Sequence, residues 1–250
     1  MKKASIIFSL FFLITSVALA GKKKSGKQCC KPKVEKQVNS DSIAQILALK
    51  MGDYQTAIVF SYKALAQDPN NLTELINLAK LYYKSGQFEL AINSCNQIIQ
   101  NDTMSIVGME LAALSFKNLK NFSAASQLYL EMHKRFSNPK YLYDLASIQF
   151  ENKKYDDCLN TISAIVNAEE SINKSIGMTR QNAMGQFINE EINLVAASLN
   201  MAGFVTLQQE NLKNAEAYFQ KALQVQPSFV LAENNLKEVQ KKQALSTEKK

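Results

Sequence analysis

The chain has 250 residues, of which 46% are hydrophobic and 20% are charged, and its formal net charge is +7. The positive charge is concentrated at the N-terminus, because residues 1–40 contain nine of the 29 basic residues and only one of the 22 acidic residues. Residues 41–250 are therefore close to neutral and lack the excess of Lys and Arg that neutralises phosphates in nucleic-acid complexes. We expect no nucleic acid among the partners.

Residues 1–20, MKKASIIFSLFFLITSVALA, have the features of a secretory signal peptide. Two lysines precede an apolar stretch, and Ala18 and Ala20 form the small-x-small pattern that signal peptidase recognises. The alternative is an uncleaved anchor, but the apolar stretch is shorter than the roughly 20 residues that a membrane-spanning helix needs. We expect cleavage after Ala20 and export, to the periplasm or envelope in a bacterium and otherwise to secretion.

Residues 21–37 read as a basic, disordered linker, because they are rich in lysine and poor in apolar side chains. A second reading is peripheral contact with an anionic membrane surface. The lysines that would make this contact are Lys22, Lys23, Lys24 and Lys27. The adjacent Cys29 and Cys30 are either an incidental exposed pair or a site of intermolecular disulfide formation or thiol attachment.

A repeat begins near residue 38. Its marker is a small residue that recurs every 34 or 33 positions, and a large apolar residue stands three positions before each marker. This spacing places both side chains on one helical face. The first four markers are Ala57, Ala91, Ala125 and Cys158, and Ala215 follows after a longer gap. Paired residues such as Leu78-Ala79 stand twelve positions before a marker, and prolines such as Pro69 stand twelve positions after one and end the second helix. The repeating unit is therefore a helical hairpin.

This pattern resembles the tetratricopeptide repeat (TPR). The signature residues are Ala57, Ala64 and Pro69 in the first unit, and Gly203, Ala215, Phe219, Ala222 and Pro227 in the last. The resemblance implies an all-α fold, a right-handed α-solenoid of about five TPR hairpins over residues 38–242. The repeats are expected near residues 38–71, 72–105, 106–138, 139–172 and 196–229.

Two segments lie outside the period. In the insertion 173–195, Gly177 and Gly185 interrupt any long helix, which predicts a loop or small hairpin between about 168 and 186. The residues that follow Gly185 are alternatively an early start of the next helix. The insertion is either a tolerated surface excursion or a functional one. Residues 228–242 are expected to form a C-terminal capping helix with a polar outer face, and residues 243–250 a tail.

Residues for catalysis or metal binding are scarce. The single histidine, His133, is expected on a packing surface rather than as a base, and no carboxylates cluster around it in the sequence. Cys95 and Cys158 lie two repeats apart, so we expect them to be buried as small apolar side chains rather than paired in a disulfide. We predict no catalytic residue, no metal site and no cofactor.

The resemblance also implies a binding site, because the first helices of TPR hairpins line a concave groove that holds an extended peptide or a helix of a partner. Tyrosines and phenylalanines interleaved with lysines suit apolar and acidic partner side chains, although several of these aromatics alternatively pack within the groove wall. The residues at the groove positions are Ile76, Lys80, Tyr83, Lys84, Glu110, Leu114, Lys117, Lys140, Tyr143, Phe150, Asn200, Phe204 and Leu207.

The sequence thus predicts a non-catalytic scaffold or adaptor, exported to the cell envelope, that binds another protein or peptide. The alternative is a structural component of an envelope or secretion assembly, tethered by the basic N-terminal tail. An enzyme is a third class, for which the sequence offers no specific motif. The asparagine-and-lysine clamp by which chaperone-associated TPR proteins hold a terminal carboxylate is not evident, because the corresponding stretch Asp41–Ile46 offers Ser42 and Ile46.

Overall fold

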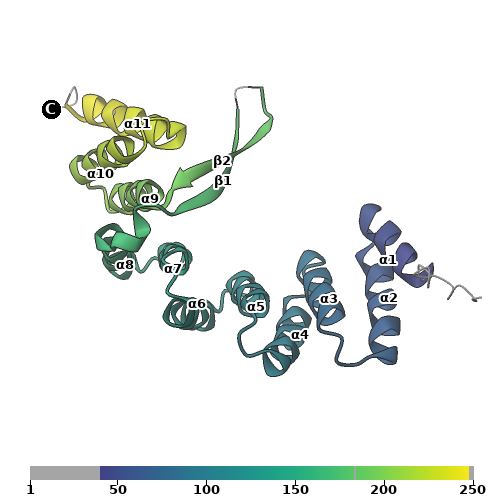
Figure 1. Cartoon of the computed structure of the whole chain (residues 1–250). Helices are drawn as coiled ribbons and strands as arrows, with labels where there is room; N and C mark the ends of the chain where they lie inside the picture. The colour runs from purple at the N-terminus through teal and green to yellow at the C-terminus, as the bar shows by residue number, and fades with distance from the viewer. Residues whose placement is uncertain (1–39, 183, 248–250) are drawn as a thin grey trace, which may run out of the picture. The chain divides into compact units, whose positions relative to one another are not determined.

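The computed structural model describes residues 40–182 and 184–247 (Figure 1). The expected signal peptide (residues 1–20) and basic linker (residues 21–37) lie outside these residues, together with Cys29, Cys30 and the lysine cluster. Export, membrane contact and thiol chemistry at this end therefore remain predictions. Within the described residues, no helix is long and apolar enough to cross a membrane.

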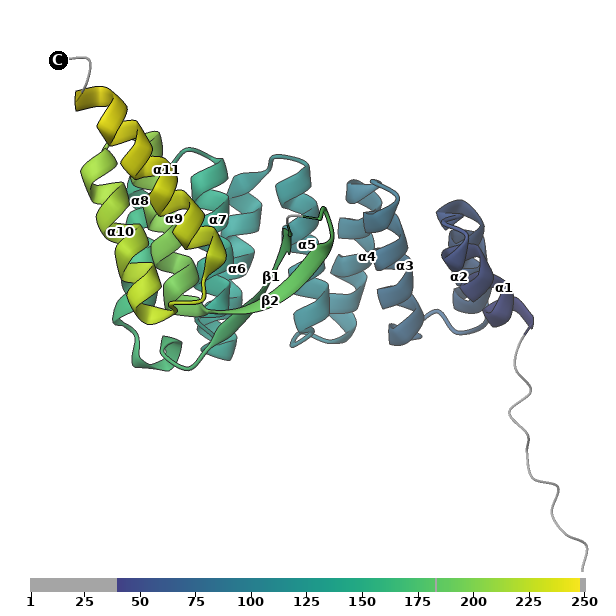
Figure 2. The same ribbon diagram turned by 90° about the horizontal axis from the view of Figure 1, so that it is seen from above.

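Ten helices form five consecutive hairpins, and each helix packs against the next one along the chain (Figures 1 and 2). This arrangement confirms the predicted all-α solenoid. The pairs are α1 (Ser40–Lys50) with α2 (Tyr54–Gln67), α3 (Leu72–Lys84) with α4 (Phe88–Asn101), α5 (Ile106–Asn118) with α6 (Phe122–Phe136), α7 (Lys140–Glu151) with α8 (Tyr155–Asn167), and α9 (Leu194–Gln208) with α10 (Leu212–Val225).

Side-chain caps fix where many of these helices begin. Asn71 accepts a hydrogen bond from the backbone N–H of Glu74 at 3.1 Å, as its position before the helix predicts. Asp53, Ser105, Asn121 and Asn211 cap their helices in the same way. These caps help to fix where α2, α3, α5, α6 and α10 begin.

The turn inside every hairpin contains one residue with a left-handed backbone. In the first two repeats it is a glycine, Gly52 or Gly86, for which this conformation carries no steric penalty. The later repeats have Lys120, Lys153 and Glu210 at the same place, with φ between 58° and 60°. A non-glycine residue there costs about 1–2 kcal/mol, so the turn is set by the packing of the two helices.

Small residues at the repeat markers let the helices approach closely. All five markers are fully buried, and Cys158 takes the place of alanine without disturbing the stack. At Gly203 the approach is closest, because a Cβ atom built there would lie 2.4 Å from Cε1 of Phe219. Cys95 and Cys158 are free and buried, as predicted, and burial raises the pKa of each thiol to about 12.

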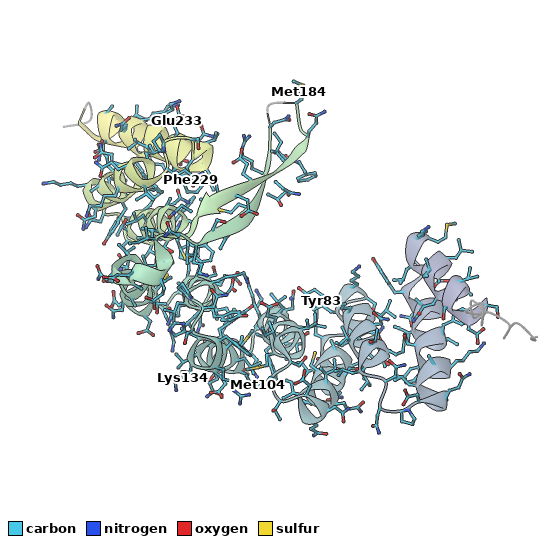
Figure 3. All side chains as sticks on the ribbon, viewed as in Figure 1. Tyr83, Met104, Lys134, Met184, Phe229 and Glu233 are labelled. Atoms are coloured by element: carbon cyan, nitrogen blue, oxygen red, sulfur yellow. The ribbon has the colours of Figure 1, made fainter. Side chains whose placement is uncertain are left out.

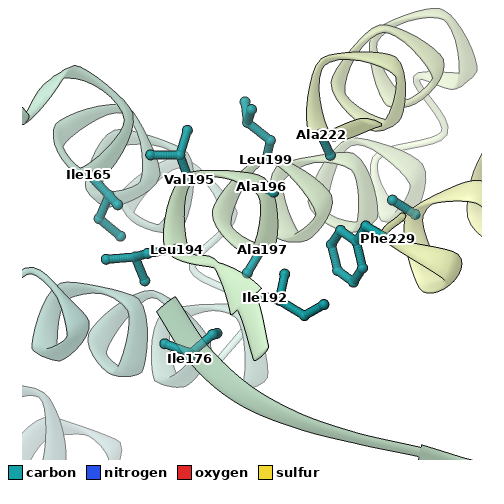
Figure 4. Packing of buried hydrophobic residues seen from close by; sticks show 11 residues of the cluster. Ile165, Ile176, Ile192, Leu194, Val195, Ala196, Ala197, Leu199, Ala222 and Phe229 are labelled. Atoms are coloured by element: carbon teal, nitrogen blue, oxygen red, sulfur yellow. The ribbon is translucent and has the colours of Figure 1, made fainter. Parts of the chain in front are cut away.

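The insertion forms an antiparallel β-hairpin, with strands β1 (Ser175–Gln181) and β2 (Phe187–Asn193), after a short 3-10 turn, η1 (Glu169–Ser171). A small hairpin was one of the predictions, but it lies at 175–193 rather than between about 168 and 186. The alternative of an early helix is wrong, because residues 187–193 pair with β1 and α9 begins only at Leu194. In β2 the residues Ile188, Glu190 and Ile192 are less exposed than those between them, so the strand has one partly covered face, and Phe187 points to the other face. Ile176 and Ile192 at the base pack with Leu194 and Phe229 (Figure 4).

The last helix, α11 (Val230–Thr247), caps the C-terminal end. It starts two residues later and extends five residues further than the expected range 228–242, so that residues 243–247 are helical rather than part of a tail. Phe229 and Val239 are fully buried against α9 and α10. Glu233 is exposed on the opposite side (Figure 3). The helix therefore has the apolar inner face and polar outer face of a solenoid cap.

Candidate partner-binding face of the first helices

The predicted binding residues come from the first helices of the second to fifth hairpins: α3, α5, α7 and α9. We call the surface formed by α1 and these helices the first-helix face. Tyr83 lies on this side of the stack, whereas Met104 and Lys134 lie on the opposite side (Figure 3). The predicted residues recur at equivalent repeat positions; Ile76, for example, corresponds to Glu110, Tyr143 and Asn200. The structure gives these equivalent positions very different surroundings.

Between α5 and α7 the charged residues are paired with one another. Lys117 forms an ion pair with Glu151, with a distance of 2.5 Å between Nζ and Oε1. The ammonium of Lys140 lies 3.1 Å from Asp144 and 3.7 Å from Glu110. The Lys117–Glu151 and Lys140–Glu110 pairs join α5 to α7, whereas Lys140–Asp144 lies within α7. Three predicted residues, Glu110, Lys117 and Lys140, therefore have intramolecular partners.

Burial shifts the pKa values of this cluster. It raises the pKa of Asp144 above its ordinary value, and the neighbouring Lys140 offsets only part of this shift. The pKa of Tyr129 is raised by burial and by the nearby carboxylates of Asp144 and Glu110. The sequence analysis did not include Asp144 or Tyr129. Asp144 stands four residues after Lys140, a spacing that places the two side chains together on a helix. This pair could therefore have been predicted from the sequence.

The predicted aromatic residues pack into the wall of the face, which was the second of the two readings. Tyr83 makes an edge contact with Phe88 and accepts a hydrogen bond from Asn118 at 3.3 Å. Phe150 packs against Tyr155. Tyr143 joins the cluster at the base of the β-hairpin, and burial raises its pKa to about 12.

Two aliphatic residues of the predicted set are half-buried. Ile76 packs against the cluster of Leu75, Ala79 and Ile98. Leu114 offers its carbonyl to the side chain of Asn118 at 2.8 Å. The side chain of Ile76 therefore contributes to the stack of helices.

In the fifth repeat α11 closes off part of the predicted groove, whereas Phe204 and Leu207 still line a pocket of about 540 Å³ together with Glu238 and Lys242 of α11. Asn200 is only 4% exposed and accepts a hydrogen bond from Asn235 of α11 at 2.9 Å. Phe204 and Leu207 pack against the cluster that contains Phe219 and Val239. The assignment of Asn200 as an accessible contact is therefore wrong, since its amide already has a partner within the chain.

The opposite end of the face is open. A pocket of about 440 Å³ lies between α1 and α3. Ile46, Leu49 and Leu81 form its apolar part, and Lys80 and Lys84 are exposed at its edge. Neither lysine forms an ion pair with any described residue. We call this the α1–α3 pocket, and of the thirteen predicted residues only these two lysines line it.

The polar lining of the α1–α3 pocket is held in place by hydrogen bonds. The side-chain amide of Gln45 donates to the carboxylate of Glu74 at 2.7 Å and to Ser61 at 2.8 Å. Asn77 donates to the other oxygen of Glu74 at 3.3 Å. Glu74 is buried, so the exposed charge at the pocket is that of the two lysines. These bonds fix α1 against α3 and keep the pocket formed.

Several residues of this pocket were missed by the sequence analysis. Ser42, Ile46 and Leu49 stand 34 residues before Ile76, Lys80 and Tyr83, so they occupy the same repeat positions in the first hairpin. The repeat period contained the signal, but the predicted set began only with the second repeat. Gln45 follows no such pattern, and its role depends on the contact between α1 and α3.

The described residues show no evident catalytic or metal-binding site. No group of three or more His, Cys, Asp or Glu in residues 40–182 and 184–247 is placed to hold a metal ion. A ring nitrogen of His133 lies 3.3 Å from the carbonyl oxygen of Asn138, and the side chain is half-buried. His133 thus has a structural contact at the end of α6.

Solved structures with this arrangement of helices come from TPR proteins. A structure of the MamA protein has a TM-score of 0.54 at 18% identity, over 75% of this chain and 90% of that chain. MamA 41-end from Desulfovibrio magneticus RS-1 has a TM-score of 0.54 at 10% identity, over 76% and 94%. YrrB, described as a TPR protein with an unusual peptide-binding site, has a TM-score of 0.51 at 14% identity, over 77% and 88%. At these identities the similarity shows the fold alone.

Comparison of the sequence with family models gives a consistent result. Three models, each described as a tetratricopeptide repeat, match residues 48–107, 139–164 and 196–229. No curated protein sequence gives a significant match. The matched segments coincide with hairpins of the structure, and with the solenoid fold they identify the chain as a member of the tetratricopeptide repeat family.

Proposed function

We propose that this TPR protein is an exported, non-catalytic adaptor that binds an extended peptide or helix of a partner protein at the N-terminal end of its first-helix face. TPR folds serve as protein–protein interaction scaffolds and are generally non-catalytic, which supports the class of function. The observation that carries the proposal is the α1–α3 pocket, where exposed lysines without ion pairs stand beside exposed apolar side chains.

The residues of the α1–α3 pocket indicate which side chains a partner segment should carry. Ile46 and Leu49 are 53% and 37% exposed, so an apolar partner side chain can remove them from water. Lys80 and Lys84 stand one turn apart on α3 and favour an acidic residue next to that side chain. The amide oxygens of Gln45 and Asn77 add hydrogen-bond acceptors for the backbone N–H groups of a partner, because both Gln45 N–H donors and one of Asn77 are bonded to Glu74 and Ser61. The expected ligand is an apolar residue flanked by acidic ones.

The part of the first-helix face between α5 and α7 also supports the α1–α3 pocket as the binding site, because its lysines differ from those of the pocket. The cations of Lys117 and Lys140 already have carboxylate partners, so a ligand there must break existing ion pairs before it gains new ones. A ligand at the α1–α3 pocket meets no such competition from Lys80 or Lys84. The difference supports the N-terminal end of the solenoid as the location of the charge-dependent part of binding.

Export to the cell envelope is part of the proposal and comes from the sequence of residues 1–20. The alternative role, a structural component of an envelope or secretion assembly tethered through Lys22, Lys23, Lys24 and Lys27, rests on the basic tail. A salt-sensitive association with membranes that is lost on deletion of residues 21–37 favours that role.

The proposal is tested by affinity purification of the protein from its native envelope, followed by quantitative identification of bound proteins. The test variant is Lys80→Glu/Lys84→Glu, which we expect to lose the partner that the unmodified protein recovers. The matched control is Lys134→Glu/Lys213→Glu, which makes the same change of charge at two exposed lysines on other helices. Equal recovery by both variants would refute a binding site at the α1–α3 pocket.

A further inference from the structure

One exposed turn of the chain has the chemistry that the α1–α3 pocket is expected to bind. Residues 169–172 comprise the short 3-10 turn η1 and the residue that follows it, and we call them the η1 turn. Ile172 is 58% exposed, and Glu169 and Glu170 are exposed beside it. Neither carboxylate forms an ion pair with a described residue. The η1 turn therefore presents an apolar side chain together with two unpaired acidic charges.

This combination distinguishes the η1 turn from other exposed segments. Of the large apolar side chains exposed in the described residues, only Ile172 has two acidic residues within three positions along the chain. Phe187 has Glu190 at that distance, but Glu190 is paired with Arg180. Lys174 also stands near Ile172, immediately before β1, so that two acidic residues and one lysine leave residues 169–174 with a net charge of −1. The segment remains acidic.

Hydrogen bonds hold the η1 turn in a fixed shape. The backbone N–H of Ile172 donates to the carbonyl of Glu169 at 3.2 Å, and the carbonyl of Ile172 accepts a bond from the side-chain amide of Asn193 at 2.8 Å. Residues three apart in a 3-10 turn lie on the same side, so Glu169 stands beside Ile172 and Glu170 lies on the adjacent side. Because the turn is already ordered, its binding loses little conformational entropy.

The α1–α3 pocket carries the complementary groups. Ile46 and Leu49, which are 53% and 37% exposed, offer an apolar surface for a side chain such as that of Ile172. Lys80 and Lys84 line the same pocket one turn apart, and neither has an ion pair among the described residues. The pocket thus offers two unpaired positive charges beside an apolar surface, and the η1 turn offers two unpaired negative charges beside an apolar side chain.

The two surfaces belong to different hairpins. The η1 turn packs against α8, in the fourth hairpin, whereas the pocket is formed by the first and second hairpins. Because the hairpins between them stack in chain order, the η1 turn is held away from the pocket of its own chain (Figure 1). We propose that the η1 turn of one copy binds in the α1–α3 pocket of a second copy. This inference rests on the proposed function, since it uses the same pocket and the same ligand chemistry.

The contact joins two different surfaces, so it is heterologous. Each added copy leaves one pocket and one η1 turn unoccupied, and association continues to a ring or an open chain. A single turn in a pocket of about 440 Å³ is a small contact compared with the roughly 800 Å² that each partner buries in a stable interface. Association is therefore expected to be weak and to depend on protein concentration. A foreign partner with the same chemistry competes for the pocket.

Sedimentation velocity of the purified protein over a range of concentrations tests the proposal. The unmodified protein is expected to form larger species as the concentration rises, whereas Glu169→Lys/Glu170→Lys and Lys80→Glu/Lys84→Glu are each expected to stay monomeric. The matched controls, Glu89→Lys/Asp156→Lys and Lys134→Glu/Lys213→Glu, make the same changes of charge at exposed residues on other helices and are expected to associate normally. Thermal melts of each variant establish that it is folded.

Mixing the two test variants examines the pairing of charges directly. In the mixture, the acidic pocket of Lys80→Glu/Lys84→Glu meets the basic turn of Glu169→Lys/Glu170→Lys, and the basic pocket of the second variant meets the acidic turn of the first. The mixture is expected to form the larger species that neither variant forms alone. A mixture that stays monomeric, or an unmodified protein that is monomeric at all concentrations, would overturn the proposal.

These results are separable from a failure of the proposed function. If the unmodified protein is monomeric while Lys80→Glu/Lys84→Glu still loses its envelope partner, self-association is wrong and the proposed function stands. If mixing restores association while both pairs of lysine variants recover the same envelope proteins, the η1 turn is the ligand of the pocket and a foreign partner at this site is refuted.

Discussion

The two ends of the first-helix face use equivalent repeat positions in opposite ways. At the N-terminal end Lys80 is exposed at the edge of an open pocket, whereas its equivalent in the fifth repeat, Phe204, is half-buried against Phe219 and Val239. Ile76 and Asn200 are a second equivalent pair, and Asn200 is closed off by a hydrogen bond to Asn235. A repeat position therefore indicates which way a side chain faces, but the neighbouring elements decide whether a partner can reach it.

The closed end is tested most strongly by Asn235→Ala. This change leaves the buried amide of Asn200 without its partner, which is expected to cost about 1–3 kcal/mol in the free energy of unfolding of the C-terminal repeats. Hydrogen exchange of the α9–α11 amides measures the loss. The double variant Asn200→Ala/Asn235→Ala is expected to be less destabilised than the sum of the two single variants. Unchanged protection of α11 in Asn235→Ala would contradict the view that this bond helps to close the face.

The open end is tested by neutral substitutions of its lysines. Lys80→Gln and Lys84→Gln are each expected to weaken partner binding by about 0.2–1 kcal/mol, the range of exposed ion pairs. The loss is expected to shrink as salt is added, because exposed charges are screened. Isothermal titration with the recovered partner at two salt concentrations measures both effects. A loss that stays constant with salt would indicate a packing role for the two side chains.

The smallest expected effect is a pH dependence from the paired region between α5 and α7. Because burial raises the pKa of Asp144, the native protein retains this proton at pH values where the unfolded chain has lost it. The stability contributed by this group therefore falls as pH rises from the ordinary pKa of Asp through the raised one. Asp144→Asn is expected to remove this slope, as measured by urea unfolding at a series of pH values. Identical slopes in both proteins would show that Asp144 is not shifted.

The repeat period was sufficient to predict the five hairpins, because it records the packing of small residues such as Ala57 against large ones at a fixed spacing. It also contained the positions of Ile46 and Leu49, one period before the predicted set. The sequence did not reveal the burial of Asn200, which depends on how far α11 reaches across α9. The strand Phe187–Asn193 was missed because its apolar residues, Phe187, Ile188 and Ile192, do not alternate strictly with polar ones, and a helix was expected to follow.

The central claim, that a partner binds at the α1–α3 pocket, is tested most directly by photo-crosslinking in the native cell. A photoreactive amino acid placed at Leu49 lies inside the pocket, and one placed at Lys134 lies on the opposite side of the stack. We predict a covalent adduct with a partner protein from position 49 and none from position 134. An adduct from position 134 in the absence of one from position 49 would contradict the account.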